Sequence, residues 1–167
     1  NQVTYRRFLN IEDVCRAYCF AECIMIDAPI GLPEDRKQAE CRPDRKARKE
    51  IPHRTSTIFA VPCRQAVYAK TDSSAKQENQ RVLGKSLSCQ SCGILETILE
   101  VDQFLEHNPT WKNKLLESHP EVAFKILNGN QEVLSSKKDD IGFVERCNIL
   151  NQWVPDSRCY IEDFSKK

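Results

Sequence analysis

Acidic residues at the ends of two short apolar stretches are the first candidates for chemistry in this sequence. Asp27 directly follows Ile24–Ile26. In the stretch 115–119, Glu117 follows two leucines, and Glu121 lies just beyond this stretch. The continuous apolar run Ile24–Ile26 predicts a buried strand of a parallel sheet, and 115–119 predicts a second short strand that ends in polar groups. In α/β sheets, ligands and catalytic groups gather at the carboxyl ends of strands. Asp27 is therefore a site candidate, and the alternative is an Asp that caps the following turn.

Carboxylates with lysine or arginine nearby are what metal-dependent phosphoryl hydrolysis requires. Hard divalent cations such as Mg²⁺ prefer carboxylate oxygens and retain waters. In two-metal hydrolysis, ions about 4 Å apart activate a water molecule and stabilise the leaving oxygen. We therefore expect Asp27, Glu117 and Glu121 to bind Mg²⁺ or Mn²⁺ and to serve phosphodiester hydrolysis.

A basic segment follows the first acidic position. Residues 34–54 contain eight Lys and Arg residues against five Asp and Glu residues, a local excess of three positive charges. A solvated helix face explains such a pattern without any ligand. The functional interpretation is contact with phosphate, because the arginine fork matches phosphate oxygens. The candidates for binding nucleic acid are Arg42, Arg45, Arg48 and Arg54.

Nine cysteines are many for this length, but their number is odd and their spacing is scattered. Cys89 and Cys92 form the only C-x-x-C pair, and the three histidines are isolated. A zinc site needs a second such pair or closely spaced histidines, so packing thiols are favoured over a redox or metal module at this pair. Free thiols without secretory signals predict a cytoplasmic protein.

Length and composition predict one soluble domain over residues 1–167. The chain is 40% hydrophobic and 29% charged, with a formal net charge of +1. No run approaches the roughly 18 apolar residues of a membrane helix, so no membrane partner is expected. The near-neutral charge provides no global field for nucleic acid. The absence of G-x-G-x-x-G and Walker motifs excludes the nucleotide-binding folds that use them.

The elements that must position these residues can be read in order along the chain. Alternation over residues 3–8 predicts a strand, and Asn10 predicts the N-cap of a helix of about two turns. With the strand Ile24–Ile26, this order indicates an α/β layer fold with a right-handed crossover. A further helix is expected after Pro43, with Asp44 in its first turn.

The second half of the chain has a long helical pattern and two shorter ones. Apolar residues spaced by 7, 4, 3 and 4 positions predict an amphipathic helix over about 85–107. Pro120 is expected to open another helix that ends at 128–129, and a basic turn at 135–138 precedes a last one. The apolar positions of the long helix are Leu87, Ile94, Ile98, Val101 and Leu105.

Several ordered motifs resemble those of one protein family. Residues 26–32 resemble its I-D-x-P-I-G-L signature, and 41–48 resemble C-D-x-x-A-R with two extra residues after Cys. Residues 56–62 match S-x-[VI]-F-x-x-P, 117–129 resemble E-x-H-P-E-x-x-F-x-x-L-N-G, and 136–138 resemble S-K-K. The chain, over roughly residues 22–150, thus resembles the family of unknown function numbered 429, whose members are regarded as predicted ribonuclease H-like nucleases.

The resemblance implies a ribonuclease H-like mixed sheet flanked by helices, with acidic residues around divalent metal. It implies that Asp27, Glu117, Glu121, His119 and Lys137 serve catalysis on DNA or RNA. The family's first strands, with their Asp, and its C-terminal acidic helix have no counterpart in this sequence. We therefore expect the fold to be incomplete at both ends. The alternative function is a non-catalytic nucleic-acid-binding module that uses the basic segment 36–54.

Overall fold

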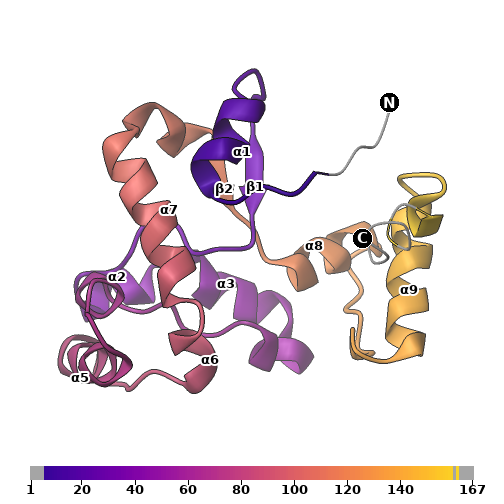
Figure 1. Ribbon diagram of the computed structural model, residues 1–167. Helices are drawn as coiled ribbons and strands as arrows, with labels where there is room; N and C mark the ends of the chain where they lie inside the picture. The colour runs from indigo at the N-terminus through magenta and orange to yellow at the C-terminus, as the bar shows by residue number, and fades with distance from the viewer. Residues whose placement is uncertain (1–5, 160, 162–167) are drawn as a thin grey trace.

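The computed structural model describes residues 6–159 and 161 as a mixed α/β arrangement that is mostly helical (Figure 1). Its two strands are short, and its helices vary from one turn to more than three. In chain order the elements are α1 (Ile11–Ala17), β1 (Ile24–Ile26), α2 (Arg36–Glu40), α3 (Pro43–Glu50), η1 (Pro52–Thr57), α4 (Arg64–Val67), α5 (Asp72–Leu83), α6 (Cys89–Cys92), α7 (Leu95–His107), η2 (Pro109–Asn113), β2 (Leu115–Glu117), α8 (Pro120–Leu127) and α9 (Asp140–Asn151).

Strands β1 and β2 pair in parallel, so the parallel arrangement predicted for Ile24–Ile26 is confirmed. Ile24 lies opposite Leu115, and Ile26 lies opposite Glu117. The backbone N–H of Ser118 donates to the Ile26 carbonyl over 2.7 Å, so the pairing continues to the strand ends. Asp27 and Ser118 therefore leave the sheet at the same edge, which is the carboxyl edge of both strands.

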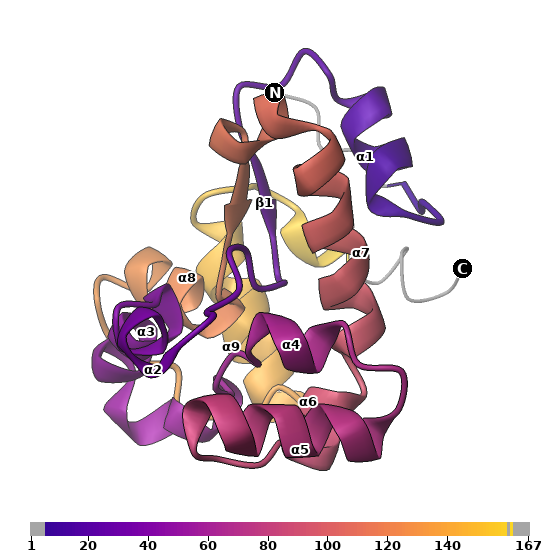
Figure 2. The same ribbon diagram turned by 90° about the vertical axis from the view of Figure 1, so that its left-hand side faces the viewer.

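The expectation that β1 is buried is wrong for one of its faces. Met25 is 65% exposed and its neighbour Leu116 is 44% exposed. The other face packs on α1 and α7, where Ile24, Ile26 and Leu115 belong to a cluster of apolar side chains. Figure 2 shows β1 beside α7 on one side, with α1 on the other side of that helix. Three-residue strands with one covered face thus replace the expected two-sided strand.

The N-terminal helix begins where Asn10 predicts. The Asn10 side chain accepts a hydrogen bond from the Asp13 N–H over 2.8 Å, and α1 runs for two turns. The Ile11 N–H also donates to the Glu100 side chain, which fastens the start of α1 to α7. The strand expected over 3–8 is not formed at residues 6–8, and its remaining part lies outside the described residues. The helices after Pro43 and Pro120 begin at those prolines, as expected.

The helix expected over 85–107 is two helices, α6 and α7. Ser88 caps α6 by accepting from the Ser91 N–H, and the two hydroxyls are 2.9 Å apart. These local bonds compete with a continuous helix, and the chain leaves the helical path at residues 93–94. Helix α5 was not expected at all, although Thr71 and Ser74 form a capping box at its start.

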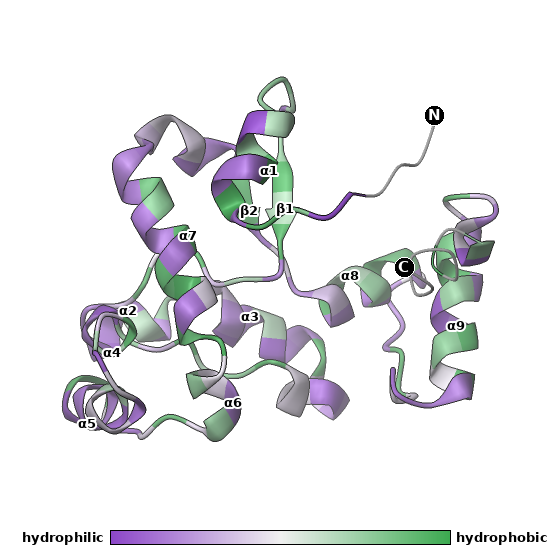
Figure 3. Cartoon of the chain, in the orientation of Figure 1, coloured by the Kyte–Doolittle hydropathy of each residue, from purple (hydrophilic) through white to green (hydrophobic). Residues whose placement is uncertain are grey.

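Three apolar clusters hold these elements together. One joins α4, α5, α6 and α7 around the fully buried Ile98 and Cys63, a second lies under the strands, and a third joins α3 to the turn after it. Figure 3 shows hydrophobic residues along both strands, whereas hydrophobic and hydrophilic residues alternate along α7. In the part of the chain that the structure describes, no helix is long and apolar enough to cross a membrane.

Candidate functional site at the strand ends

The carboxyl edge of the strand pair opens onto a cavity of about 680 Å³. Asp27 and the residues after it form one wall, and 118–121 form the next. The start of α7, the segment around Phe59 and the basic turn before α9 complete the lining. Its polar and charged side chains include Asp27, Arg54, Ser118, His119, Glu121, Lys137, Lys138 and Arg146.

Asp27 offers its carboxylate to this cavity. The residue is exposed and forms no hydrogen bond or ion pair with any described residue. The chain after Asp27 turns sharply at Gly31, which has a φ of +75°. Residues other than glycine adopt such a φ only at a cost in conformational energy. The Asp27 carboxylate is thus available to a ligand, in the position the sequence predicts.

Glu117 lies in the structure behind the cavity and does not line it. Its Oε2 accepts from Arg42 Nη2 over 2.7 Å and from the Ile30 N–H over 3.0 Å. Arg42 also donates to Asp44 and to the carbonyls of Ile30 and Gly31. This network fastens the turn after Asp27 to the end of β2. Glu117 was expected to be a metal ligand. In the structure, however, its Oε2 already accepts hydrogen bonds from two donors.

Arg42 does not have the surface position that contact with nucleic acid requires. The residue is only 6% exposed, and each of its side-chain nitrogens donates to a carboxylate or a carbonyl. A buried guanidinium with its donors occupied cannot also bind a phosphate without breaking the network. The assignment of Arg42 to a nucleic-acid surface is therefore corrected to a structural role.

His119 lies between Glu117 and the cavity. Its Nε2 is 3.4 Å from Glu117 Oε1, and neither atom has a hydrogen-bond partner among the described residues. Burial by itself raises the pKa of Glu117, but the His119 ring and the Arg42 charge outweigh it, so this pKa lies below its ordinary value. Glu117 is thus held ionised beside the ring, and a carboxylate in this place orients an imidazole that lines the cavity.

Glu121 reaches the cavity but is paired with two arginines. Arg146 Nη2 donates to both carboxylate oxygens over 3.1 and 2.9 Å, and Arg54 Nη2 is 3.6 Å from Oε1. Arg146 also donates to the Ser135 carbonyl and so fastens the basic turn to α8. Arg146 was not expected at the site, because no local sequence pattern reveals a partner that lies 25 residues away.

The basic turn brings two lysines to the cavity. Lys137 and Lys138 are exposed and form no ion pair within the described chain. With Arg54 and Arg146 they give four cations against the carboxylates of Asp27 and Glu121, an excess of two positive charges. Such a lining attracts anions more than metal cations. Arg45 and Arg48, the other expected phosphate contacts, line a different hollow.

The carboxylates do not form a ready-made two-metal centre. Among residues 6–159 and 161, no three His, Cys, Asp or Glu side chains are close enough together to hold a metal ion. Asp27 lines the cavity unpaired, whereas Glu117 and Glu121 are paired with arginines. Mg²⁺ also binds through one carboxylate together with substrate phosphates and waters. The residues therefore fit one ion at Asp27, completed by a phosphate ligand.

The cysteines of the C-x-x-C pair do not form a set of metal ligands together with the charged residues of the cavity. Cys92 is buried in the core and Cys89 is exposed, and both are free thiols. Cys92 packs beside Leu95 and Ile98, which is the role expected for a structural thiol.

Fold and site together define a mixed α/β protein with a basic cavity at the carboxyl ends of two parallel strands. A family described as protein of unknown function (DUF429) matches residues 1–166. The chain belongs to this family. No curated protein and no solved structure matches the chain.

Proposed function

We propose that this protein is a metal-dependent phosphodiester hydrolase, a nuclease of the ribonuclease H-like type that acts in the strand-end cavity. One observation carries the proposal. An unpaired carboxylate, an imidazole held by a buried carboxylate, and exposed lysines line one cavity at the carboxyl edge of a parallel strand pair. These are the groups that bind a phosphodiester and move protons around it.

Each residue has a distinct role in this proposal. Lys137, Lys138 and Arg54 bind the phosphate oxygens, as cations facing an anionic substrate do. Asp27, together with the substrate phosphate, would hold one Mg²⁺ or Mn²⁺. A bound ion of this kind supplies Lewis-acid chemistry at the phosphoryl oxygen. His119, oriented by Glu117, either accepts a proton from the attacking oxygen or donates one to the leaving oxygen.

The fold type is part of the proposal. Two parallel strands with an acidic residue directly after the first one are compatible with the centre of a ribonuclease H-like sheet. The ordered motifs around Asp27 and His119 support the same interpretation, because they resemble those of a family whose members are regarded as predicted ribonuclease H-like nucleases. The substrate is therefore nucleic acid, with a phosphodiester in the cavity.

The test is cleavage of labelled single-stranded DNA and RNA with Mg²⁺ or Mn²⁺, with and without a chelator. We expect cleavage that needs the metal and that Asp27→Asn reduces by about 100-fold or more. Asp156→Asn is the matched control, because Asp156 is exposed, lies outside the cavity and has a φ of +61° that Asn tolerates. Wild-type cleavage rates in Asp27→Asn would refute the proposal.

The second candidate is a non-catalytic nucleic-acid-binding module built on residues 36–54. The exposed cations of α2 and α3 favour it, although the buried Arg42 cannot take part. Salt-dependent binding without cleavage, with Asp27→Asn binding like wild type, supports this candidate over the nuclease. The exposed cations are Arg36, Lys37, Arg45, Lys46 and Lys49.

A further inference from the structure

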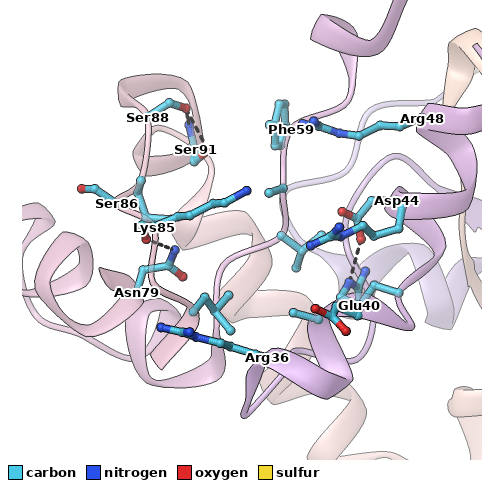
Figure 4. Close-up of a pocket in the computed structure, with 17 residues that line it drawn as sticks. Arg36, Glu40, Asp44, Arg48, Phe59, Asn79, Lys85, Ser86, Ser88 and Ser91 are labelled. Atoms are coloured by element: carbon cyan, nitrogen blue, oxygen red, sulfur yellow. Dashed lines mark hydrogen bonds and ion pairs between the residues drawn. The ribbon is translucent and has the colours of Figure 1, made fainter. Parts of the chain in front are cut away.

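A second hollow lies on the other side of the chain segment 59–61. It measures about 490 Å³ and shares Phe59 and Val61 with the strand-end cavity. Figure 4 shows α2 and α3 on one side of it, and the end of α5, the following loop and α6 on the other. Two chain segments about 40 residues apart in sequence thus face each other across this hollow.

The charges around this hollow are not balanced. Four cations, Arg36, Arg45, Arg48 and Lys85, line it against the single unpaired carboxylate of Glu40. The lining also contains Arg42 and Asp44, which neutralise each other over 3.1 Å. Within the described chain, none of the four cations forms an ion pair. The hollow thus has an excess of three positive charges.

Arg48 brings a buried hydrogen-bond donor to the lining of the hollow. Its Nε is buried and has no hydrogen-bond partner among the described residues. In Figure 4 the side chain extends from α3 toward Phe59. A buried donor without an acceptor is costly, and native structures rarely leave one. By contrast, the buried Arg42 and Arg146 each form an ion pair with a carboxylate.

The opposite wall holds its polar groups in fixed places. The buried Asn79 accepts from the Cys63 N–H over 2.8 Å and donates to the Lys85 carbonyl over 2.8 Å. These two bonds fix the backbone that carries Lys85. Ser88 and Ser91 present hydroxyls close to each other on the same wall. The Lys85 side chain is shown in Figure 4 extending from this wall into the hollow.

We propose that this hollow binds the phosphate group of a small phosphorylated molecule. The arginines and Lys85 match phosphate oxygens, and the serine hydroxyls can donate to the same group. The apolar side chains of Leu83, Leu87 and Val61 line the rest and accommodate an uncharged part of the ligand. The volume lies within the usual range of about 300–1,000 Å³ for ligand pockets. This binding site is separate from the strand-end cavity and does not depend on hydrolysis there.

The experiment is isothermal titration calorimetry of the full chain with inorganic pyrophosphate and with adenosine monophosphate, in the absence of divalent metal. We expect saturable binding that Arg48→Gln and Lys85→Gln each weaken by about tenfold, the loss of one charge-assisted hydrogen bond. Lys76→Gln is the matched control, because Lys76 lies on α5 outside the hollow and outside the basic segment 36–54. This variant should bind within about twofold of wild type.

A third titrant, a short single-stranded oligonucleotide, distinguishes the sources of the phosphate. Binding of pyrophosphate and mononucleotide that the oligonucleotide does not displace identifies a free phosphorylated molecule, and displacement identifies a nucleic-acid backbone. The first result supports the proposed small ligand, whereas displacement overturns that assignment in favour of a nucleic-acid backbone. No binding at millimolar pyrophosphate and mononucleotide, or equal weakening by Lys76→Gln, overturns the phosphate site itself. Asp27→Asn should bind these probes like wild type, so failure of the nuclease proposal leaves this test intact.

Discussion

At the scale of single residues, the Glu117 carboxylate connects three parts of the chain. It binds the Arg42 guanidinium, the backbone after Asp27, and the ring of His119. Its side chain is 6% exposed, so these contacts are made away from bulk water. The role of Glu117 is therefore to position the turn behind Asp27 and the His119 ring, rather than to meet a ligand itself.

We expect Glu117→Gln to lower the free energy of unfolding at pH 7 by about 3 kcal/mol, because it breaks the buried ion pair between Glu117 and Arg42. The folded pKa of Glu117 lies below its ordinary value, so its stabilisation is complete above about pH 4.3 and is lost as the pH falls through the folded pKa. Urea unfolding of both proteins between pH 3 and 7 should show the difference shrinking at the acidic end.

The control for this measurement is Glu106→Gln. Glu106 pairs with Lys112 over 3.0 Å on the surface, where solvent screens the pair, so its removal should change the free energy of unfolding little. A Glu117→Gln variant that is no less stable than this control would contradict a structural role for the buried network.

At the scale of elements, the contact between α9 and the turn before it places the two lysines of the strand-end cavity. Gly142 lies so close to this turn that an added Cβ would be 1.9 Å from the Ser136 carbonyl oxygen. Arg146, one turn further along α9, donates to the Gly142 carbonyl and to the Ser135 carbonyl. The absence of a side chain at residue 142 thus allows the helix to hold residues 136–138 against the cavity.

Gly142→Ala should therefore destabilise the protein by about 1–3 kcal/mol, because backbone must move to admit the methyl group. The same shift displaces Lys137 and Lys138, so cleavage or phosphate binding at the strand-end cavity should weaken as well. Thermal unfolding measures the first effect, and substrate titration of the variant measures the second.

Gly93→Ala provides a matched comparison for this substitution. An added Cβ at residue 93 has its nearest neighbour at 3.6 Å, an ordinary van der Waals distance. Its effect on the free energy of unfolding should stay within about 0.5 kcal/mol. Equal destabilisation by the two substitutions would show that close packing at Gly142 is not the cause.

At the scale of the whole molecule, positive charge is concentrated rather than general. The net charge is +1, yet the two hollows on either side of residues 59–61 carry excesses of two and three positive charges. The balancing carboxylates are located elsewhere, as in the pairs of α1, where Arg16 meets Glu12 and Asp13. An anion is therefore attracted to two adjacent sites and not to the surface at large.

This distribution makes a prediction for salt dependence. A single-stranded oligonucleotide whose phosphates meet about four of these cations should show a slope of log K against log salt near −3. Fluorescence anisotropy between about 50 and 200 mM salt measures it. Lys137→Gln should make the slope shallower by about 0.7, whereas Lys76→Gln, on α5 away from both linings, should leave it unchanged. A slope near zero for wild type would argue against phosphate contacts by these side chains.

The sequence by itself determined the elements whose signals are local. Apolar residues before Asp27 define β1, Asn10 defines the start of α1, and Pro120 defines the start of α8. In each case the deciding interactions lie within a few residues along the chain. At Ser88 and at the residues after Cys92, local signals conflict with the apolar periodicity. Periodicity alone therefore predicted a single long helix where the structure has α6 and α7.

Only the tertiary structure decided which charged residues form the site. Asp27, His119 and Lys137 meet at one cavity, but Glu117 is paired with Arg42 across 75 positions of the chain and Glu121 with Arg146 across 25. The type of a carboxylate fixes what it can bind, whereas its available partners depend on long-range packing. For that reason the sequence identified the strand end where a ligand can bind, and the fold selected Asp27 as the carboxylate free to meet it.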